Sequence, residues 1–186
     1  EDALRRDLPV VLDNLGPRSY VSMQELSGIL PFGLRHYWKG HFLHSLDRDL
    51  LEALVAMRSD EDARGFDFIL IEGLAGSPRE EPPGGAAFGQ RATRWNASAL
   101  GIWELPEDDE AGIRWARRTA ALLEPYSLSG AGYVNYAPAD ESAERVRAAY
   151  GDERWQRLVA VKRRYDPDNV FRFNHNVRPD AVGEPA

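Results

Sequence analysis

The clearest helical pattern in the chain begins at Asp47, a residue type that often caps the start of a helix. The apolar residues around it recur every three or four positions: Leu46, Leu50, Leu51, Leu54 and Val55. Residues at this spacing share one side of an α-helix. We therefore expect an amphipathic helix here, with that side packed against a core.

Two later segments have the same period. The run 107–125 opens with four acidic residues, which suit the positive end of a helix, and its apolar face is Ile113, Ala116, Ala120 and Leu123. A last helix is expected from about Asp152, with apolar positions Trp155, Leu158, Val159 and Val161. Asp166-Pro167 should end it, because the residue before a proline avoids helical geometry.

Shorter apolar runs without helical spacing predict β-strands. They cover residues 20–23, 36–42, 66–74, 95–105 and 130–138, and a short aromatic strand is expected just before Asn174. The run 66–74 is apolar on both faces, which indicates a central position in a sheet. The stretch 76–85 is rich in Pro and Gly and predicts a loop.

Strands come in runs and do not alternate regularly with helices. This order favours an α+β fold, in which an antiparallel β-sheet has helices packed on one face. No internal repeat and no glycine-rich phosphate-binding motif is visible in the sequence.

Composition narrows the function classes. The chain has 186 residues, a net charge of −7 and no cysteine, so we expect neither disulfides nor nucleic-acid binding. No apolar run approaches the roughly 20 residues that cross a bilayer, and no signal-peptide pattern opens the chain. Basic residues are almost all Arg, and Ala and Gly are abundant, which suggests a GC-rich bacterial genome. We expect a cytoplasmic bacterial protein that binds no membrane, and, because residue 1 is Glu, we consider that it is a fragment.

A metal site is not expected. His41 and His44 are three residues apart, but the sequence around them predicts a strand and a turn. No third metal ligand is suggested by the sequence. The acidic run 107–110 is interpreted as a solvated helix start.

The stretch "YVNY", residues 133–136, is open to two interpretations. In a strand, Tyr133 and Asn135 would point to one face and Val134 and Tyr136 to the other. One interpretation is an ordinary packed strand; the other is a polar constellation that faces a planar ligand. A tyrosine hydroxyl can serve as a base near neutral pH when its phenolate is stabilised.

Several motifs resemble the berberine bridge enzyme-like, FAD-linked oxidases. The C-terminal part carries the most specific ones: "GYVNYAPAD", then "DERWQRLVAVKRRYDPDNVFRFNHNVRP". "HYWKGHFL" and "GIWELPEDDEAGIRWARR" are similar to segments of the same family's substrate domain. The resemblance implies a substrate-binding α+β domain (part) over 1–128 and, over 129–186, a strand-helix-strand segment that returns to an FAD-binding domain. That domain is missing from this chain.

The resemblance also implies site residues. Tyr136 matches the family's catalytic tyrosine, and Asn135, Tyr133, Asn174, His175 and Asn176 would lie beside FAD, whose ring edge needs neutral donors and acceptors. The reaction would be oxidation of an alcohol, sugar or phenolic natural product, as in secondary metabolism, by hydride transfer to flavin with Tyr136 as base. Most of the FAD would be held by the FAD-binding half of the same protein or by a partner subunit.

Substrate-side expectations are Tyr20, Trp38, Gln90 and Arg91. Gln90 stands in "FGQR", where many relatives of that family have a histidine, so substrate preference does not carry over. Two alternatives stay open. In the first, the chain is a flavin-free half-domain that binds a small molecule or a protein. In the second, it is one subunit of a split flavoenzyme.

Overall fold

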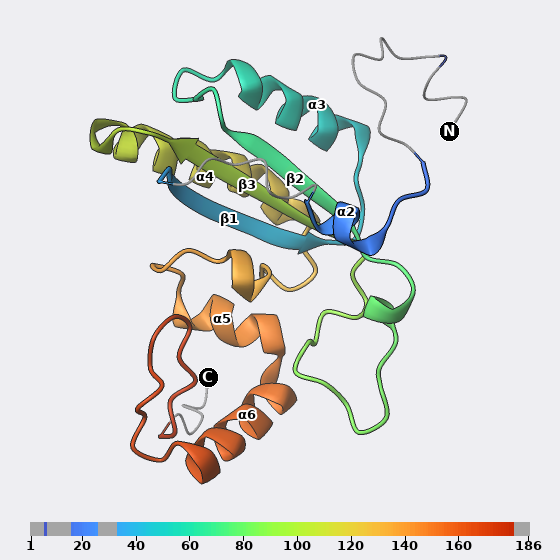
Figure 1. Ribbon diagram of the computed structural model, residues 1–186, viewed down its shortest axis with the longest axis vertical. Helices are drawn as coiled ribbons and strands as arrows, with labels where there is room; N and C mark the ends of the chain where they lie inside the picture. The colour runs from blue at the N-terminus through green and yellow to red at the C-terminus, as the bar shows by residue number, and fades with distance from the viewer. Residues whose placement is uncertain (1–5, 7–15, 26–32, 181–186) are drawn as a thin grey trace. The chain divides into compact units, whose positions relative to one another are not determined.

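The computed structural model describes residues 6, 16–25 and 33–180, and the chain divides into two compact units, Glu1–Gly33 and Leu34–Ala186. The second unit is built on three strands, β1 (Arg35–Leu43), β2 (Phe68–Gly73) and β3 (Trp95–Trp103). They form a sheet in the order β1-β3-β2 with both pairs antiparallel (Figure 1). The predicted α+β class and antiparallel sheet are confirmed.

The central strand is β3, so the central position expected for 66–74 is wrong. Every residue of β3 after Trp95 is buried, whereas β2 is only half-buried. The small side chains of β3 favour a central position, because they let the neighbouring strands and helix α4 (Asp109–Leu123) approach closely. At Gly101, for example, an added Cβ would lie 2.8 Å from the carbonyl oxygen of Gly112.

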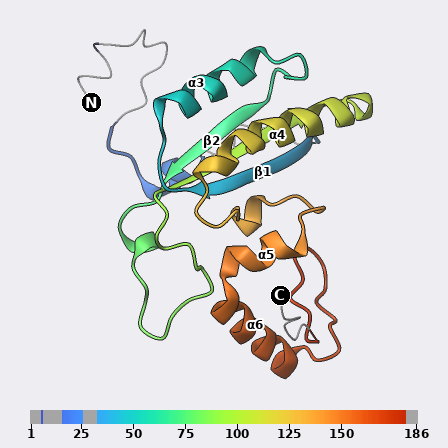
Figure 2. The ribbon, with the colours of Figure 1, turned by 180° about the vertical axis from the view of Figure 1, so that it is seen from behind.

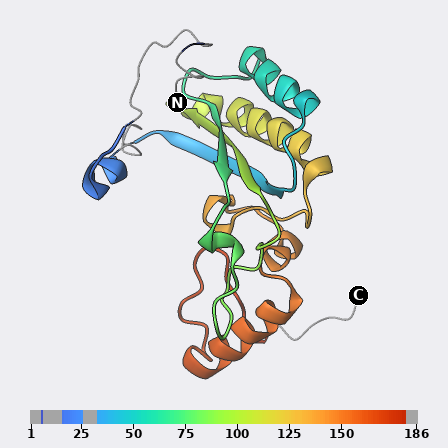
Figure 3. The same cartoon turned by 90° about the vertical axis from the view of Figure 1, so that its right-hand side faces the viewer.

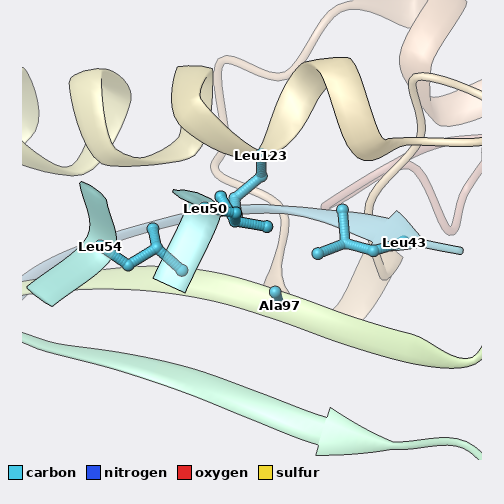
Figure 4. Packing of buried hydrophobic residues seen from close by; sticks show 5 residues of the cluster. All are labelled: Leu43, Leu50, Leu54, Ala97 and Leu123. Atoms are coloured by element: carbon cyan, nitrogen blue, oxygen red, sulfur yellow. The ribbon is translucent and has the colours of Figure 1, made fainter. Parts of the chain in front are cut away.

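Helices α3 (Arg48–Ala56) and α4 (Asp109–Leu123) cover one face of the sheet, as predicted (Figure 3). Their apolar stripes meet the sheet in a core of Leu43, Leu50, Leu54, Ala97 and Leu123 (Figure 4). A second cluster joins Trp115 and Ala116 of α4 to Ala99 of β3. The strand residues that alternate with these core residues point to the other face of the sheet, which α3 and α4 do not cover.

Two helices follow beside the β1 edge (Figures 1 and 2). The predicted α6 (Asp152–Tyr165) is present, but α5 (Ala143–Tyr150) was not predicted. The side chain of Ser142 caps α5 by accepting the N–H of Arg145, and Gly151, at φ 76°, ends it. Together α5 and α6 bury their own small cluster of Val146, Trp155 and Val159.

The expected loop between β2 and β3 is confirmed, with one 3₁₀ turn at Ser77–Arg79. It runs out to α6, where Arg154 Nε donates to the carbonyl of Ala86 at 3.0 Å and Arg157 Nη2 to that of Gly84 at 3.1 Å (Figure 3). These hydrogen bonds therefore hold the loop against α6.

Two of the expected strands are helical turns. Residues 20–23 lie in helix α2 (Tyr20–Glu25), because Ser19 Oγ accepts the N–H of Ser22 and its carbonyl accepts that of Met23. Within 130–138 the chain forms a 3₁₀ helix at Val134–Tyr136, closed by the Tyr136 N–H to the Tyr133 carbonyl at 2.9 Å.

The aromatic strand expected before Asn174 is also wrong. Asp166, almost buried, accepts the N–H groups of Val170 at 2.7 Å and Phe171 at 3.1 Å. These donors are thus used in a local turn and not in a sheet. The C-terminal segment expected to be strand-helix-strand is instead a 3₁₀ turn, two helices and an irregular return. The predicted domain division at residue 128 stays a prediction. In the part of the chain that the structure describes, no helix is long and apolar enough to span a membrane.

Candidate functional site

The 3₁₀ helix at Val134–Tyr136 brings the two tyrosines of "YVNY" together. Side chains three residues apart eclipse in a 3₁₀ helix, whereas a strand would have sent them to opposite faces. The rings of Tyr133 and Tyr136 meet edge-on with centroids 5.0 Å apart. Asn135 Nδ2 donates to Tyr133 Oη at 2.8 Å. The opposed orientation expected from a strand is wrong, and the result is one compact polar and aromatic group.

Two aromatic residues of strand β1, Trp38 and Phe42, contact this group. Trp38 lies edge-on to Tyr136 at 5.2 Å, and Phe42 lies edge-on to Tyr133 at 6.3 Å. Phe88, from the loop before β3, packs on Phe42 at 5.8 Å. Edge-to-face pairs of this kind fix ring orientations, so the tyrosines are held against the sheet.

A carboxylate lies under the second tyrosine. Glu72 of β2 and Asn96 of β3 are opposite each other in the sheet, and Asn96 Nδ2 donates to Glu72 Oε2 at 2.7 Å. Tyr136 Oη lies 3.4 Å from Glu72 Oε1, to which it donates. Burial, followed by the negative charge of Glu72, raises the pKa of Tyr136 above its usual value.

These residues line a cleft of about 450 Å³. Its walls are mainly apolar and aromatic, with Glu72, Asn96 and the tyrosine hydroxyls as the polar groups: Phe42, Glu72, Leu74, Pro78, Phe88, Asn96, Tyr133 and Tyr136. A concave apolar surface with a few convergent polar groups is typical of a small-molecule site.

A second cleft, of about 740 Å³, lies on the other side of the 3₁₀ helix. Here the returning C-terminal segment places Asn174 and His175 beside Asn135. His175 Nε2 is 3.3 Å from the carbonyl oxygen of Ala137, which ties this segment to the tyrosine-bearing turn. Asn176 follows, and its Oδ1 is buried without a hydrogen-bond partner among the described residues.

These neutral side chains fit the edge of a flavin. The ring edge carries carbonyls and ring nitrogens, and amide groups can both donate to and accept from them. Asn135, Asn174 and His175 line one cleft together with Arg172, whereas Asn176 is not among its lining residues and its Oδ1 is buried. Three of the sequence-predicted cofactor residues thus lie at one cleft, and Tyr133 is bonded to one of them, Asn135; their cofactor role stays a prediction.

Of the expected substrate-side residues, the three in the second unit, Trp38, Gln90 and Arg91, are not gathered in one place. Trp38 borders a third opening, of about 550 Å³, together with Asn135 and Tyr136. Gln90 is engaged elsewhere: its Nε2 donates to the carbonyls of Ala148 and Ala149 at the end of α5, at 2.9 and 3.2 Å.

Arg91 donates to the carbonyl of Pro78 at 2.9 Å and stacks over Phe88 at 5.1 Å, so it supports a wall of the 450 Å³ cleft from outside. Tyr20 belongs to the other compact unit and its side chain is exposed. The substrate roles of these residues stay predictions.

Sequence reasoning missed Glu72, Asn96 and Phe42. A signal was present at Glu72, which is the charged residue of the otherwise apolar strand β2. Among the described residues, no three His, Asp or Glu side chains gather in a way that could hold a metal ion.

Comparison with known proteins points to one family. Residues 132–178 match the family model described as berberine and berberine like. The chain is 31% identical over 180 residues to (R)-6-hydroxynicotine oxidase of Paenarthrobacter nicotinovorans, a match that covers 91% of this chain and 38% of that relative.

Solved structures agree in fold. The crystal structure of 6-hydroxy-D-nicotine oxidase from Arthrobacter nicotinovorans matches with a TM-score of 0.72 and 25% identity, covering 96% of this chain and 41% of that one. Berberine bridge enzyme from Eschscholzia californica matches with a TM-score of 0.66 and 19% identity, over 87% of this chain and 36% of that one, which shows the fold alone. The chain therefore spans between 36% and 41% of the length of these proteins.

Proposed function

Because the chain belongs to the berberine bridge enzyme-like family of FAD-linked oxidoreductases, we propose that it is the substrate-binding and C-terminal portion of such an enzyme. The whole enzyme would oxidise an alcohol, a sugar or a phenolic natural product. When bound, FAD supplies the hydride acceptor. The observation that carries the proposal is the grouping of Tyr136, Asn135 and Trp38 at the junction of three clefts.

Tyr136 is the proposed base. Its ring is held by Trp38 and Tyr133, so its hydroxyl has a fixed direction, toward the 450 Å³ cleft that would hold the substrate. In that role it takes the proton from the substrate hydroxyl that is being oxidised. The aromatic walls of the cleft exclude water and favour an apolar or ring-shaped substrate body.

Asn135, Asn174 and His175 are proposed to hold the flavin ring edge from the 740 Å³ cleft, with Tyr133 and the next residue in the chain, Asn176, supporting them. Most of the cofactor site would come from an FAD-binding half, either in the same protein or in a partner subunit. Exposed apolar side chains on the returning segment support this: Val170, Phe171 and Phe173 are 62%, 80% and 83% exposed. Such a run on one segment suits a surface that another domain covers.

The test is Tyr136→Phe in an intact protein that contains this chain. We expect turnover to fall by about 10²–10⁴-fold, the range typical of a general base, with bound FAD unchanged. The matched control is Tyr126→Phe, because Tyr126 packs against the core under α3 and outside the clefts. Full turnover in the Tyr136 variant would remove this residue from the mechanism. An intact wild-type protein that binds no FAD would favour the flavin-free binding module instead.

A further inference from the structure

The environment of Tyr136 is unusual for a base. Burial and the adjacent Glu72 both raise its pKa, so loss of its proton to water at neutral pH is disfavoured. The titratable groups that share its clefts are Glu72 and Tyr133 on one side and His36, Tyr37 and Asp140 on the other. Of these, Glu72 is the hydrogen-bond acceptor of the Tyr136 hydroxyl. A base role for Tyr136 therefore needs this carboxylate.

Glu72 is held in a suitable geometry. One carboxylate oxygen, Oε2, is fixed by Asn96 Nδ2 at 2.7 Å, and the strand register sets the two residues opposite each other. The other oxygen, Oε1, is left toward Tyr136 at 3.4 Å. That separation exceeds an ordinary O–H···O bond, and catalytic hydrogen bonds are often long before substrate binds and tighten afterwards.

We propose that Glu72 is the positioning residue of Tyr136: it orients the phenol hydroxyl and receives its proton while Tyr136 takes the proton of the substrate. One O–H bond breaks on the substrate and one forms on Tyr136; the original Tyr136 O–H breaks and one forms on Glu72. FAD, when bound, would supply the acceptor for the hydride that carries away the electron pair of the substrate C–H bond. Tyr136 stays neutral throughout, so no isolated phenolate is needed. This inference rests on the proposed function.

The first test compares Glu72→Gln with wild type in the intact protein. Glutamine keeps the shape of the side chain, and its single carbonyl oxygen can accept from Asn96 while its amide group faces Tyr136, so the fold and FAD content should be unchanged, but it cannot take up the proton. We expect kcat to fall about 10²-fold, of the order of a general acid–base contribution, with KM nearly unchanged. Glu72→Asp should recover part of the rate, and Glu104→Gln, at an exposed site, is the control.

The second test needs no turnover. The near-ultraviolet absorbance of tyrosinate is titrated in wild type and in Glu72→Gln, with Tyr136→Phe to identify the signal. Removal of the carboxylate charge should lower the pKa of Tyr136. An unchanged titration, or a Glu72→Gln enzyme with wild-type kcat, would overturn the inference while leaving the proposed function intact. A wild-type protein without FAD-dependent turnover would overturn the proposed function, and the relay with it.

Discussion

At the scale of the residue, His41 differs from the other three histidines in being buried. It is 3% exposed on β1, and its Nδ1 has no hydrogen-bond partner among the described residues. Burial, followed by the positive charges of Arg145 and Lys39, lowers the pKa of His41 to about 4, against the opposing charge of Glu141. The native state therefore keeps this imidazole neutral over a range in which an unfolded chain would protonate it.

The consequence is acid sensitivity. The pKa of His41 is about 4 folded and 6.5 unfolded, so the unfolded state binds the extra proton between these values. Stability from neutral His41 is complete above pH 6.5 and is lost as the pH falls toward 4, by about 3 kcal/mol at most. Urea unfolding from pH 7.5 to 4 should show this loss, and His41→Gln should flatten it. His44→Gln, at an exposed histidine, should follow wild type; equal slopes in all three proteins would contradict the expectation.

The candidate site was only partly predictable from single residues. Tyr136 and Asn135 stand in a local motif, so the sequence indicated them directly. Glu72 is 64 positions from Tyr136, and its orientation depends on the register that sets it against Asn96. Such a pairing follows from the strand order, which hydrophobic pattern does not specify when two strands are both apolar. The partner of the proposed base was therefore invisible until the sheet was known.

At the scale of the element, the 3₁₀ helix depends on close backbone contact with β1. A Cβ on Gly132 would lie 2.5 Å from the carbonyl oxygen of Gly40, and a Cβ on Gly40 would lie 2.3 Å from that of Ala97. Both partners are backbone atoms, which cannot move aside as a flexible side chain could. The missing Cβ of Gly132 therefore lets the tyrosine-bearing turn approach β1, and the missing Cβ of Gly40 lets β1 lie close to β3.

Gly132→Ala should push this turn away from β1. We expect a loss of stability of about 1–3 kcal/mol, the usual cost of overpacking, together with weaker near-ultraviolet circular dichroism from the contact of Trp38 with Tyr136. Equilibrium unfolding and circular dichroism would measure the two effects. Gly65→Ala is the matched control, because an added Cβ there meets open space. If both variants behave alike, the close contact does not position the turn.

Elements differed in how well their pattern predicted them. Helices α3, α4 and α6 have nine to fifteen residues with one apolar stripe, so periodicity identified them. Helix α5 has eight residues and was missed, although Ser142 before it and Gly151 after it are end signals. "YVNY" alternates like a strand, but it forms a 3₁₀ turn, and Gly132 just before it lies close to the backbone of Gly40 in β1. Tertiary contact outweighed local pattern there.

At the scale of the whole molecule, several exposed apolar residues and the amides proposed to face the cofactor lie on the same C-terminal segment. Asp166 turns the chain after α6, and the exposed Val170, Phe171 and Phe173 follow at once, just before Asn174. Under the proposed function, this one segment would offer both a surface for another domain to cover and side chains for a flavin edge. This arrangement suits a cofactor site completed by two parts, and the match to about 36–41% of the relatives' length agrees with it.

The expected outcome is that this chain alone keeps no FAD. After incubation with FAD and desalting, its visible spectrum should show no flavin band, whereas an intact protein that contains it should stay yellow. In the intact protein, a double change of Phe171 and Phe173 to Ser should reduce retained FAD. The same change should leave the melting temperature of the isolated chain nearly unaltered, because both side chains are exposed there. A lasting flavin band on the isolated chain would mean that its own residues complete the site, and the second half would then not be needed to hold the cofactor.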